Sequence, residues 1–296
     1  MKNFEQELYD FLTGTGRCAS VPMPVHVTMA GELPVFDCGE GRLAVVAVPL
    51  DYFVRGGSVA ELRQAAGAVA AAGTVYVYED RWRGAGPLTR SMLEVRLGQG
   101  MRVFARNCGV RIITAQTAAA FLERNHVYGP ARSEIRLGLF RERATGAGEA
   151  AMDRTPQLAA VAVFSGGRRM DGGILSYEWV RYASLRGVRV TGGMGRLLEA
   201  FADGVRERSG SEPFEVMTYS DEEWFDGGSY AGLGFVEAGR RQPVAFLCPP
   251  DGSWRVHEGK FMTDRRFRAM ARDTDLPSCT VQVLNLGSLR FVRRFD

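Results

Sequence analysis

The alternation of apolar and polar residues predicts several short strands and helices in the first third of the chain. Ser58, followed three positions later by Glu61, forms a capping-box pattern that opens an alanine-rich helix expected over 60–72. Pro87 opens a second helix, because proline favours the first helical turn. Strands are expected over 33–37, 43–50 and 74–78, the first two as a hairpin. This order predicts a small α/β unit.

The pattern restarts after residue 108, where Thr114 caps a helix expected to end at His126. A second helix is expected over 196–208, because its apolar residues recur at helical spacing. A short helix over 226–233 follows further along the chain. Strands are expected over 110–113, 135–140, 158–164, 177–183 and 214–219, with a final hairpin of 235–238 and 244–248.

The length of 296 residues leaves room for about two domains of ordinary size. We place the first domain at 1–108 and the second at 109–250, where the pattern restarts. Residues 251–296 form an arginine-rich C-terminal extension expected to pack on the rest. A stretch rich in glycine, alanine and glutamate at 143–155 predicts an exposed hairpin loop in the second domain.

The composition is typical of a globular protein, with 46% hydrophobic and 24% charged residues. The sequence contains no apolar run of roughly 18 to 20 residues, so a transmembrane helix is not expected. Glu5 and Glu7 are acidic where a secretory signal is basic and then apolar, so a cytoplasmic location is expected. The five cysteines are scattered and there are three histidines, so we expect neither a disulfide framework nor a metal site.

A glycine-rich segment stands directly before the helix expected over 196–208. It reads Val190, Thr191, Gly192, Gly193, Met194 and Gly195, and Arg196 follows it. Glycines let a ligand approach the backbone closely, and the free N–H groups of a first helical turn attract an anion. The pattern is therefore typical of a phosphate-binding turn. The alternative is a turn that only packs a helix onto a sheet.

A second motif, Tyr230-x-x-Leu233-Gly234-Phe235, follows the next expected strand. Together with the order of the elements, the two motifs resemble the GNAT superfamily of acyl-CoA N-acyltransferases. The resemblance implies an α/β (α+β) fold, with a C-terminal mixed sheet flanked by helices and a smaller α/β domain before it. The family has Gln or Arg where Val190 stands here, although the neighbouring residue is an arginine.

The resemblance also implies acetyl-CoA as the acyl donor and an unknown amine as the acceptor. The glycine-rich segment would hold the pyrophosphate, and backbone N–H groups near Ala183 and Ser184 would polarise the thioester carbonyl. Tyr230 would protonate the departing CoA thiolate as a general acid. The alternative for Tyr230 is an amphipathic core residue.

Three residues are candidates for the base that deprotonates the acceptor amine. Glu178 lies in the strand expected over 177–183, and Asp221 follows the strand expected over 214–219. His126 ends the first helix of the second domain, and histidine commonly carries protons near neutral pH. The alternatives are structural, namely an ion pair of Glu178 with an arginine, an acidic turn opened by Asp221, and a hydrogen-bonded structural histidine.

The whole chain loosely resembles phage-type homing-endonuclease proteins, in which a Vsr-like or restriction-endonuclease-like domain precedes a GNAT-like one. The segments that carry this resemblance are 76–82, 103–108, 121–126 and 218–224. Asp37 and Glu79 match acidic positions of the nuclease core, but the expected strand over 43–50 has no carboxylate at its centre. Because Mg²⁺ requires several oxygen ligands, we expect residues 1–108 to be a degenerate nuclease domain without cleavage activity.

The rival function is non-catalytic association with nucleic acid, in which arginines of the C-terminal extension contact phosphates. These arginines are Arg265, Arg266, Arg268, Arg272, Arg290, Arg293 and Arg294. The alternative is an ordinary solvated helix and strand. No membrane partner is expected.

Overall fold

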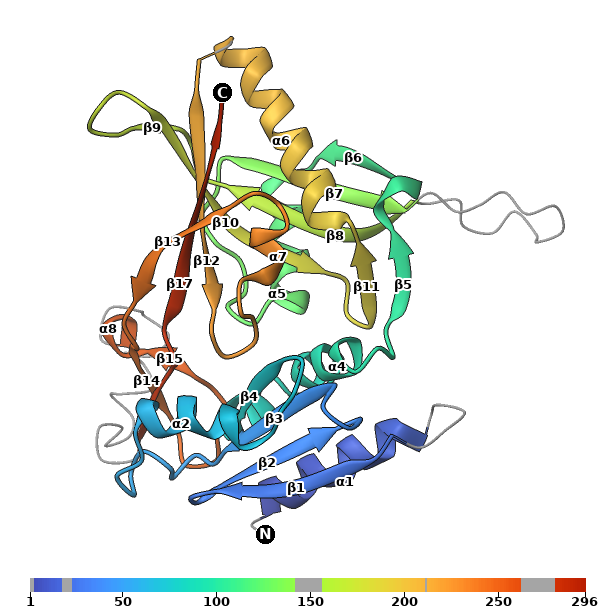
Figure 1. Cartoon of the computed structure of the whole chain (residues 1–296). Helices are drawn as coiled ribbons and strands as arrows, with labels where there is room; N and C mark the ends of the chain where they lie inside the picture. Colours follow the sequence, from blue (N-terminus) through green and yellow to red (C-terminus); the bar gives the residue numbers. More distant parts are fainter. Residues whose placement is uncertain (1–2, 18–22, 142–155, 211, 262–279) are drawn as a thin grey trace, which may run out of the picture. The chain divides into compact units, whose positions relative to one another are not determined.

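The computed structural model describes residues 3–17, 23–141, 156–210, 212–261 and 280–296 (Figure 1). The chain forms two compact units, each assembled from segments that are separate in the sequence. Unit 1 comprises Met1–Leu97, Ser220–Asp226 and Arg240–Leu289, and unit 2 comprises Gly98–Tyr219, Gly227–Gly239 and Arg290–Asp296. These units are discontinuous, whereas the boundaries placed at 108 and 250 from the sequence are continuous and stay a prediction.

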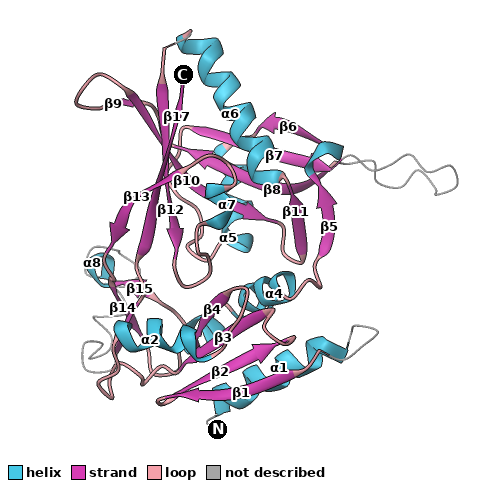
Figure 2. Ribbon diagram, viewed as in Figure 1, coloured by secondary structure: helices cyan, strands magenta, loops and turns pink. Residues whose placement is uncertain are grey.

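A four-stranded sheet forms the centre of unit 1. Its strands, in spatial order, are β1 (Val25–Ala30), β2 (Leu33–Cys38), β3 (Leu43–Val48) and β4 (Thr74–Tyr78). The first three are antiparallel neighbours, and β4 runs parallel to β3. The helices in this part are α1 (Asn3–Arg17), α2 (Val59–Ala65), α3 (Glu79–Gly84) and α4 (Gly86–Arg96) (Figure 2). The hairpin expected from the sequence is confirmed as β2 and β3.

Strand β3 is buried along its whole length, which explains its unbroken apolar sequence. Val45 shares a buried cluster with Phe4 and Leu8 of α1, whereas Val46 shares another with Leu62 of α2. Successive side chains of a strand point to opposite faces, so α1 and α2 cover the two faces of this sheet.

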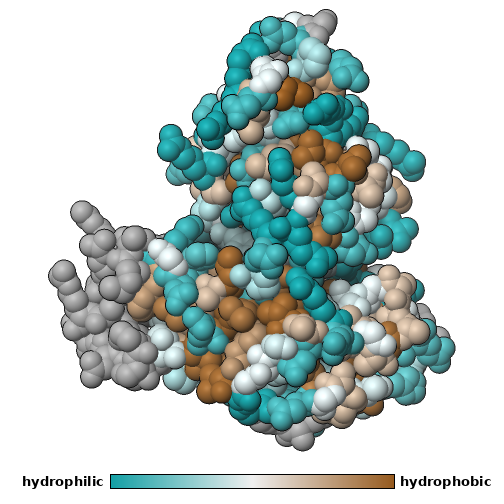
Figure 3. Space-filling view, turned by 60° about the vertical axis from the view of Figure 1, so that its left-hand side comes forward, coloured by the Kyte–Doolittle hydropathy of each residue, from teal (hydrophilic) through white to brown (hydrophobic). Residues whose placement is uncertain are grey.

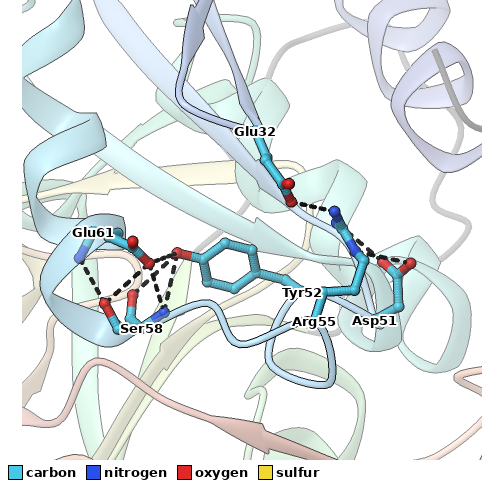
Figure 4. Close-up of polar contacts among 6 residues, drawn as sticks. All are labelled: Glu32, Asp51, Tyr52, Arg55, Ser58 and Glu61. Carbon is cyan, nitrogen blue, oxygen red and sulfur yellow. Dashed lines mark hydrogen bonds and ion pairs between the residues drawn. The ribbon is translucent and has the colours of Figure 1, made fainter.

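Helix α2 begins at the capping box expected from the sequence. Ser58 Oγ accepts the Glu61 N–H at 3.2 Å, and Glu61 Oε2 accepts the Ser58 N–H at 2.9 Å. Tyr52 Oη donates to Glu61 Oε2 at 3.1 Å (Figure 4). Burial raises the pKa of Tyr52 to about 12, so its phenol remains a donor at neutral pH. Nearby, Arg55 forms ion pairs with Glu32 and Asp51 (Figure 4).

Two expectations about element bounds were wrong. Helix α2 ends at Ala65 and continues only as the 3-10 turn Ala66–Ala68, because Gly67 lowers helical propensity in the segment expected over 60–72. The final hairpin of 235–238 with 244–248 does not form. Pro243 lies between the two segments, where it supplies no N–H for a ladder.

The two segments of the expected hairpin belong to different sheets. β13 (Val236–Arg241) is part of the large sheet described below, whereas β14 (Ala245–Cys248) pairs with β15 (Val256–His257) and β16 (Val281–Leu284). Helix α8 (Glu258–Phe261) follows β15. The Asn285 side chain accepts the Val244 N–H at 2.7 Å, which satisfies the backbone just before β14.

An eight-stranded mixed sheet forms the centre of unit 2. Its main path runs β13, β17 (Ser288–Phe295), β12 (Phe214–Asp221), β10 (Leu175–Ser184), β8 (Gln157–Phe164), β7 (Ile135–Arg141) and β6 (Cys108–Ile112), and β9 (Arg168–Arg169) pairs with β10. Strands β6, β7, β8 and β10 are antiparallel neighbours, whereas β10 and β12 are parallel. The sequence did not reveal that β17, from the C-terminal end, lies inside this sheet.

Helices cover both faces of the large sheet. Helix α5 (Ala115–Asn125), capped by Thr114 as expected, places Phe121 and Leu122 in a cluster with Val161 of β8. Helix α6 (Gly193–Ser209) lies on the opposite face, where Phe201 stacks on Phe164 with ring centroids 3.9 Å apart. Unit 2 is therefore a mixed sheet flanked by helices, as the expected α/β (α+β) fold class requires.

None of the helices among the described residues is both long enough and apolar enough to cross a membrane. Exposed large hydrophobic residues such as Val54, Ile112 and Val236 lie on separate elements. On the face drawn in Figure 3, hydrophobic patches alternate with hydrophilic residues.

Candidate active site

The central feature of unit 2 is a separation between two parallel strands. β10 and β12 pair only from Leu175 with Phe214 to Glu178 with Met217. Beyond Glu178 the register of β10 is shifted by an irregularity between Trp179 and Arg181, and the strand continues with β8 as its neighbour. A β-bulge of this kind bends a strand and ends regular pairing. Backbone pairing of β10 with β12 therefore ends at Glu178, and we call the separation of the two strands beyond Trp179 the notch.

The backbone of β10 presents alternate N–H groups to the notch. The Leu185 N–H donates to Ala159 O at 2.8 Å on the β8 side, in register with the pairing of Ala183 with Val161. Because N–H groups alternate between the two edges of a strand, the Ala183 N–H also points to β8. The N–H groups of Ser184 and Tyr182 point to the notch instead. Of the two residues expected to polarise a thioester, only Ser184 is thus oriented to do so.

The glycine-rich segment is the junction of a strand and a helix rather than a single loop. Val190 and Thr191 end β11 (Val188–Thr191), which pairs in parallel with β5 (Met101–Phe104). Gly192 is the N-cap of α6 in the left-handed conformation, with φ 77°, which glycine adopts without strain.

The start of α6 has N–H groups available for an anion. The first-turn residues Gly193, Met194 and Gly195 have no partner four residues earlier in the helix, as at any helix start. Within the described chain no side chain caps them, and Arg196 makes the first helical bond, from its N–H to Gly192 O at 3.0 Å. The helix dipole adds positive potential at the same point.

Tyr182 links the notch to the glycine segment. A Cβ atom at Gly193 would lie 2.7 Å from Tyr182 Oη and 2.7 Å from Val190 Cγ1, so only glycine fits at this position without a rearrangement. The Tyr182 hydroxyl also lies 3.2 Å from Ser184 Oγ. Burial raises the pKa of Tyr182 to about 12. Sequence reasoning missed this residue, although an aromatic residue on a strand just before a glycine segment was a usable signal.

Tyr230 is held beside the same strand by aromatic contacts. It lies in α7 (Gly228–Ala231), and its ring centroid is 5.9 Å from that of Trp179 and 5.5 Å from that of Phe291. The Thr218 hydroxyl donates to Trp179 O at 3.0 Å and lies 3.4 Å from Tyr230 Oη. Burial raises the pKa of Tyr230, so its phenol is protonated at neutral pH.

The two tyrosines share one electrostatic environment. Tyr230 is one of the groups that raise the pKa of Tyr182, so the two phenols are close enough to interact. Trp179 lies between them, with its ring centroid 6.0 Å from that of Tyr182. Trp179 therefore contacts both tyrosine rings, whose hydroxyl groups are protonated at neutral pH.

Glu178 is the last residue of β10 that pairs with β12, so it lies at the closed end of the notch. Its N–H donates to Ser165 Oγ at 2.8 Å, and its carbonyl accepts the Ser165 N–H at 2.9 Å. Its side chain is half-buried and forms no ion pair within the part of the chain that the structure describes, although it lies close enough to Arg181 to interact electrostatically.

The other two base candidates each accept a backbone N–H. His126 follows α5, and its Nδ1 accepts the Tyr128 N–H at 3.1 Å. Asp221 ends β12, and its Oδ1 accepts the Glu223 N–H at 3.0 Å in the turn that follows. Asp221 groups with unit 1, whereas Glu178, Tyr230 and the glycine segment all belong to unit 2.

The residues described here contain no group of three or more His, Cys, Asp and Glu side chains suited to a metal ion. Of the arginines expected to contact nucleic acid, Arg265, Arg266, Arg268 and Arg272 lie outside the described residues. Arg293 forms an ion pair with Glu199 at 3.2 Å, and Arg294 lies 3.9 Å from the Glu215 carboxylate.

No protein-family model matches this sequence, and no curated protein matches it. Among solved structures, the NatC complex bound to Gag peptide and CoA aligns with 64% of this chain and 99% of its own, at 9% identity and a TM-score of 0.36. The structure of AtaTR bound with AcCoA aligns with 45% of this chain and 87% of its own, at 16% identity and a TM-score of 0.31. Both TM-scores are low, so the function proposed below rests on the geometry of the notch.

Proposed function

We propose that this protein is an acyl-CoA-dependent N-acyltransferase that transfers an acetyl group to an amine. The observation that carries this proposal is the notch between β10 and β12, with the uncapped start of α6 at one end and a protonated tyrosine beside it. A notch of this kind accepts an extended thioester as a further hydrogen-bonding partner of β10, and the helix start accepts its pyrophosphate.

In the proposed reaction, the lone pair of the acceptor amine attacks the thioester carbonyl carbon and forms the new C–N bond. The Ser184 N–H, which points into the notch, stabilises the negative charge that develops on the carbonyl oxygen. The C–S bond then breaks, and the thiolate receives a proton from the phenol of Tyr230 or Tyr182. The products are the N-acetylated amine and free CoA.

The amine must lose protons during the reaction, and Glu178 is the candidate that the geometry favours as the acceptor of these protons. It lies on β10 at the closed end of the notch, half-buried and without an ion-pair partner in the described residues. In His126 the ring nitrogen Nδ1 already accepts a backbone N–H, whereas Asp221 accepts one through Oδ1 and belongs to unit 1 rather than to the unit of the glycine segment. Glu178 needs no such contact to be broken.

Acetyl-CoA binding tests the proposal directly. A ligand present at 100 times its Kd adds about 2.7 kcal/mol to the free energy of unfolding, so acetyl-CoA should raise the Tm measurably. Isothermal titration calorimetry measures the binding of acetyl-CoA without heating the protein. Acetate, which lacks the nucleotide, is the control. An unchanged Tm together with no heat of binding would exclude the acyltransferase.

A further inference from the structure

Arg181 is a half-buried cation for which the described residues supply no carboxylate. Its Nη1 donates to the Val180 carbonyl oxygen at 2.8 Å. Its Nε is buried without a hydrogen-bond partner. Its Nη2 makes no hydrogen bond to any described residue, and no acidic side chain there lies within ion-pair distance. Burial lowers the pKa of Arg181, and the nearby Tyr128 and Glu178 offset this effect only in part.

The two groups left over, Nε and Nη2, form one edge of the guanidinium plane. Nε is fully buried, whereas Nη2 is not among the fully buried atoms, so an incoming carboxylate meets Nη2 first. Bidentate pairing with both parallel N–H groups then requires Nε to become accessible as the acceptor binds. The third group, Nη1, fixes the orientation of the plane through its bond to the backbone. The Tyr128 ring, 5.7 Å from Cζ, packs against the same guanidinium. These two contacts hold the guanidinium plane in a fixed orientation.

The position of Arg181 separates it from the glycine segment. Tyr182, the next residue, places its hydroxyl against Gly193, so it lies on the face of the sheet covered by α6. Adjacent residues of a strand point to opposite faces, which places Arg181 on the face of α5. Its contact with Tyr128, just past the end of α5, and the packing of Ala183 against α5 residues agree with this placement. The phosphates of a CoA bound at the glycine segment would lie on the other face.

We propose that Arg181 binds a carboxylate carried by the acceptor, so that the substrates are primary amines that also bear a carboxylate group. This inference rests on the proposed function and adds the class of acceptor to it. Glu178 and Arg181 are close enough to interact electrostatically, but not as an ion pair. Glu178 and Arg181 carry opposite charges, and these match the ammonium and the carboxylate of one acceptor molecule.

The test compares amines that differ only in the carboxylate. Glycine, β-alanine and γ-aminobutyrate are matched with methylamine, ethylamine and propylamine, and a peptide with acidic side chains and a blocked C-terminus forms a third arm. Wild-type protein should acetylate the best carboxylated amine with a kcat/KM about tenfold to a hundredfold above its matched alkylamine, as a charged hydrogen-bonded pair allows. The arm with the highest kcat/KM identifies whether the carboxylate comes from a free amino acid or from a side chain.

Arg181→Met should remove this preference by raising KM for the carboxylated amine, while kcat/KM for the alkylamine stays the same. Arg181→Lys, which keeps the charge but not the two parallel N–H groups, should restore part of it. Arg208→Met, at an exposed position in the last turn of α6, is the control for loss of a positive charge. Equal use of both amines by wild type, or an unchanged preference in Arg181→Met, would overturn the inference and leave the acyltransferase intact.

Calorimetry keeps the two proposals apart. Wild type that binds acetyl-CoA but shows no binding of N-acetyl-β-alanine or of the other acetylated products contradicts the role of Arg181 alone. Wild type that binds no acetyl-CoA contradicts the proposed function instead. Binding of the carboxylated products that is lost in Arg181→Met and retained in Arg208→Met supports the carboxylate site by a measurement that does not depend on turnover.

Discussion

Two phenols stand beside the notch, and their contacts give them different roles. Tyr182 lies against the backbone of Gly193 and beside Ser184 Oγ, so it helps to shape the glycine segment. Tyr230 packs among Trp179, Phe235 and Phe291 and has only a long contact, 3.4 Å, to Thr218 Oγ1. The Tyr230 hydroxyl is therefore more weakly hydrogen-bonded within the protein than the Tyr182 hydroxyl.

We expect Tyr230→Phe to lower kcat about a hundredfold, with a much smaller change in the KM for acetyl-CoA. The lost hydroxyl donates a proton to the leaving thiolate, which matters mainly in the transition state. Steady-state kinetics with the best acceptor measures both parameters. Tyr182→Phe is the matched comparison and should affect acetyl-CoA binding more than kcat. The assignment of Tyr230 fails if kcat is unaltered in Tyr230→Phe and falls in Tyr182→Phe.

A buried charge cluster in unit 1 makes stability depend on pH. Glu223 Oε1 lies 3.1 Å from Arg255 Nη2, and Asp80 Oδ2 lies 3.5 Å from Arg255 Nη1, with all three side chains almost fully buried. Burial raises the pKa of Glu223 to about 7, and this effect outweighs the attraction of Arg255, which lowers it. The folded protein therefore binds a proton at Glu223 more tightly than the unfolded chain does.

The free energy of unfolding should fall as pH rises through the folded-state pKa of Glu223. A raised folded-state pKa contributes stability that is complete below the unfolded value of 4.5 and is lost as pH passes about 7. Urea unfolding between pH 5 and 8 measures this decline. Glu223→Gln, which stays neutral, should flatten it, whereas Glu212→Gln, at an exposed ion pair with Arg169, should leave the profile as in wild type. A decline of equal size in Glu223→Gln would assign it to other groups.

At the scale of elements, the helix start that follows β11 is the part of the site with the strictest steric demands. Gly192 needs a positive φ, and Gly193 has no room for a Cβ atom. Gly195 differs, because a Cβ atom there would meet only Leu233 Cδ2, at 3.2 Å. A substitution at Gly193 therefore changes the turn itself, whereas one at Gly195 leaves its backbone conformation accessible.

We expect Gly195→Asp to abolish acetyl-CoA binding while the protein stays folded, because the added carboxylate repels the pyrophosphate at the start of α6. Gly195→Ala is the matched control, since it adds the same Cβ atom without the charge, and it should still bind. Calorimetry on both folded variants, checked by circular dichroism, gives the comparison. If Gly195→Asp binds like Gly195→Ala, the segment only packs a helix onto the sheet.

Local sequence patterns predicted the elements that depend on neighbouring residues. Ser58 with Glu61, and Thr114 before α5, marked helix starts because capping involves residues only three positions apart. The position of β17 inside the sheet, and the separation of β13 from β14, depend on pairing between distant segments, which periodicity does not reveal. Likewise, the end of the pairing between β10 and β12 coincides with a register irregularity in β10 that no local pattern indicates.

At the scale of the whole molecule, the sequence of unit 2 is interrupted by segments that belong to unit 1. The turn at Ser220–Asp226 separates β12 from α7, and Arg240–Leu289 separates β13 from most of β17. Because each unit is assembled from separate segments of the chain, the two units depend on each other in folding. Neither unit corresponds to one half of the sequence. For this reason, each experiment above uses the full chain rather than an isolated domain.

The last prediction concerns the ancestry that we inferred for residues 1–108. We expect the full-length protein to cleave no DNA in the presence of Mg²⁺ or Mn²⁺, because the carboxylates that match nuclease positions have other partners. Asp37 Oδ1 accepts the Gly41 N–H at 2.7 Å, and Glu79 accepts the Leu50 N–H at 3.0 Å.

The strand between these two carboxylates offers no further ligand, since β3 consists of buried apolar residues such as Val45 and Val46. Mg²⁺ keeps several of its waters but still needs carboxylates free to bind it, and here Asp37 and Glu79 each accept a backbone N–H while β3 supplies no acidic side chain. Nicking of supercoiled plasmid, followed by gel electrophoresis over a range of metal concentrations, is the measurement. Metal-dependent nicking that disappears in Asp37→Ala but persists in Glu40→Ala, an exposed-turn control, would contradict the prediction and assign nuclease chemistry to unit 1.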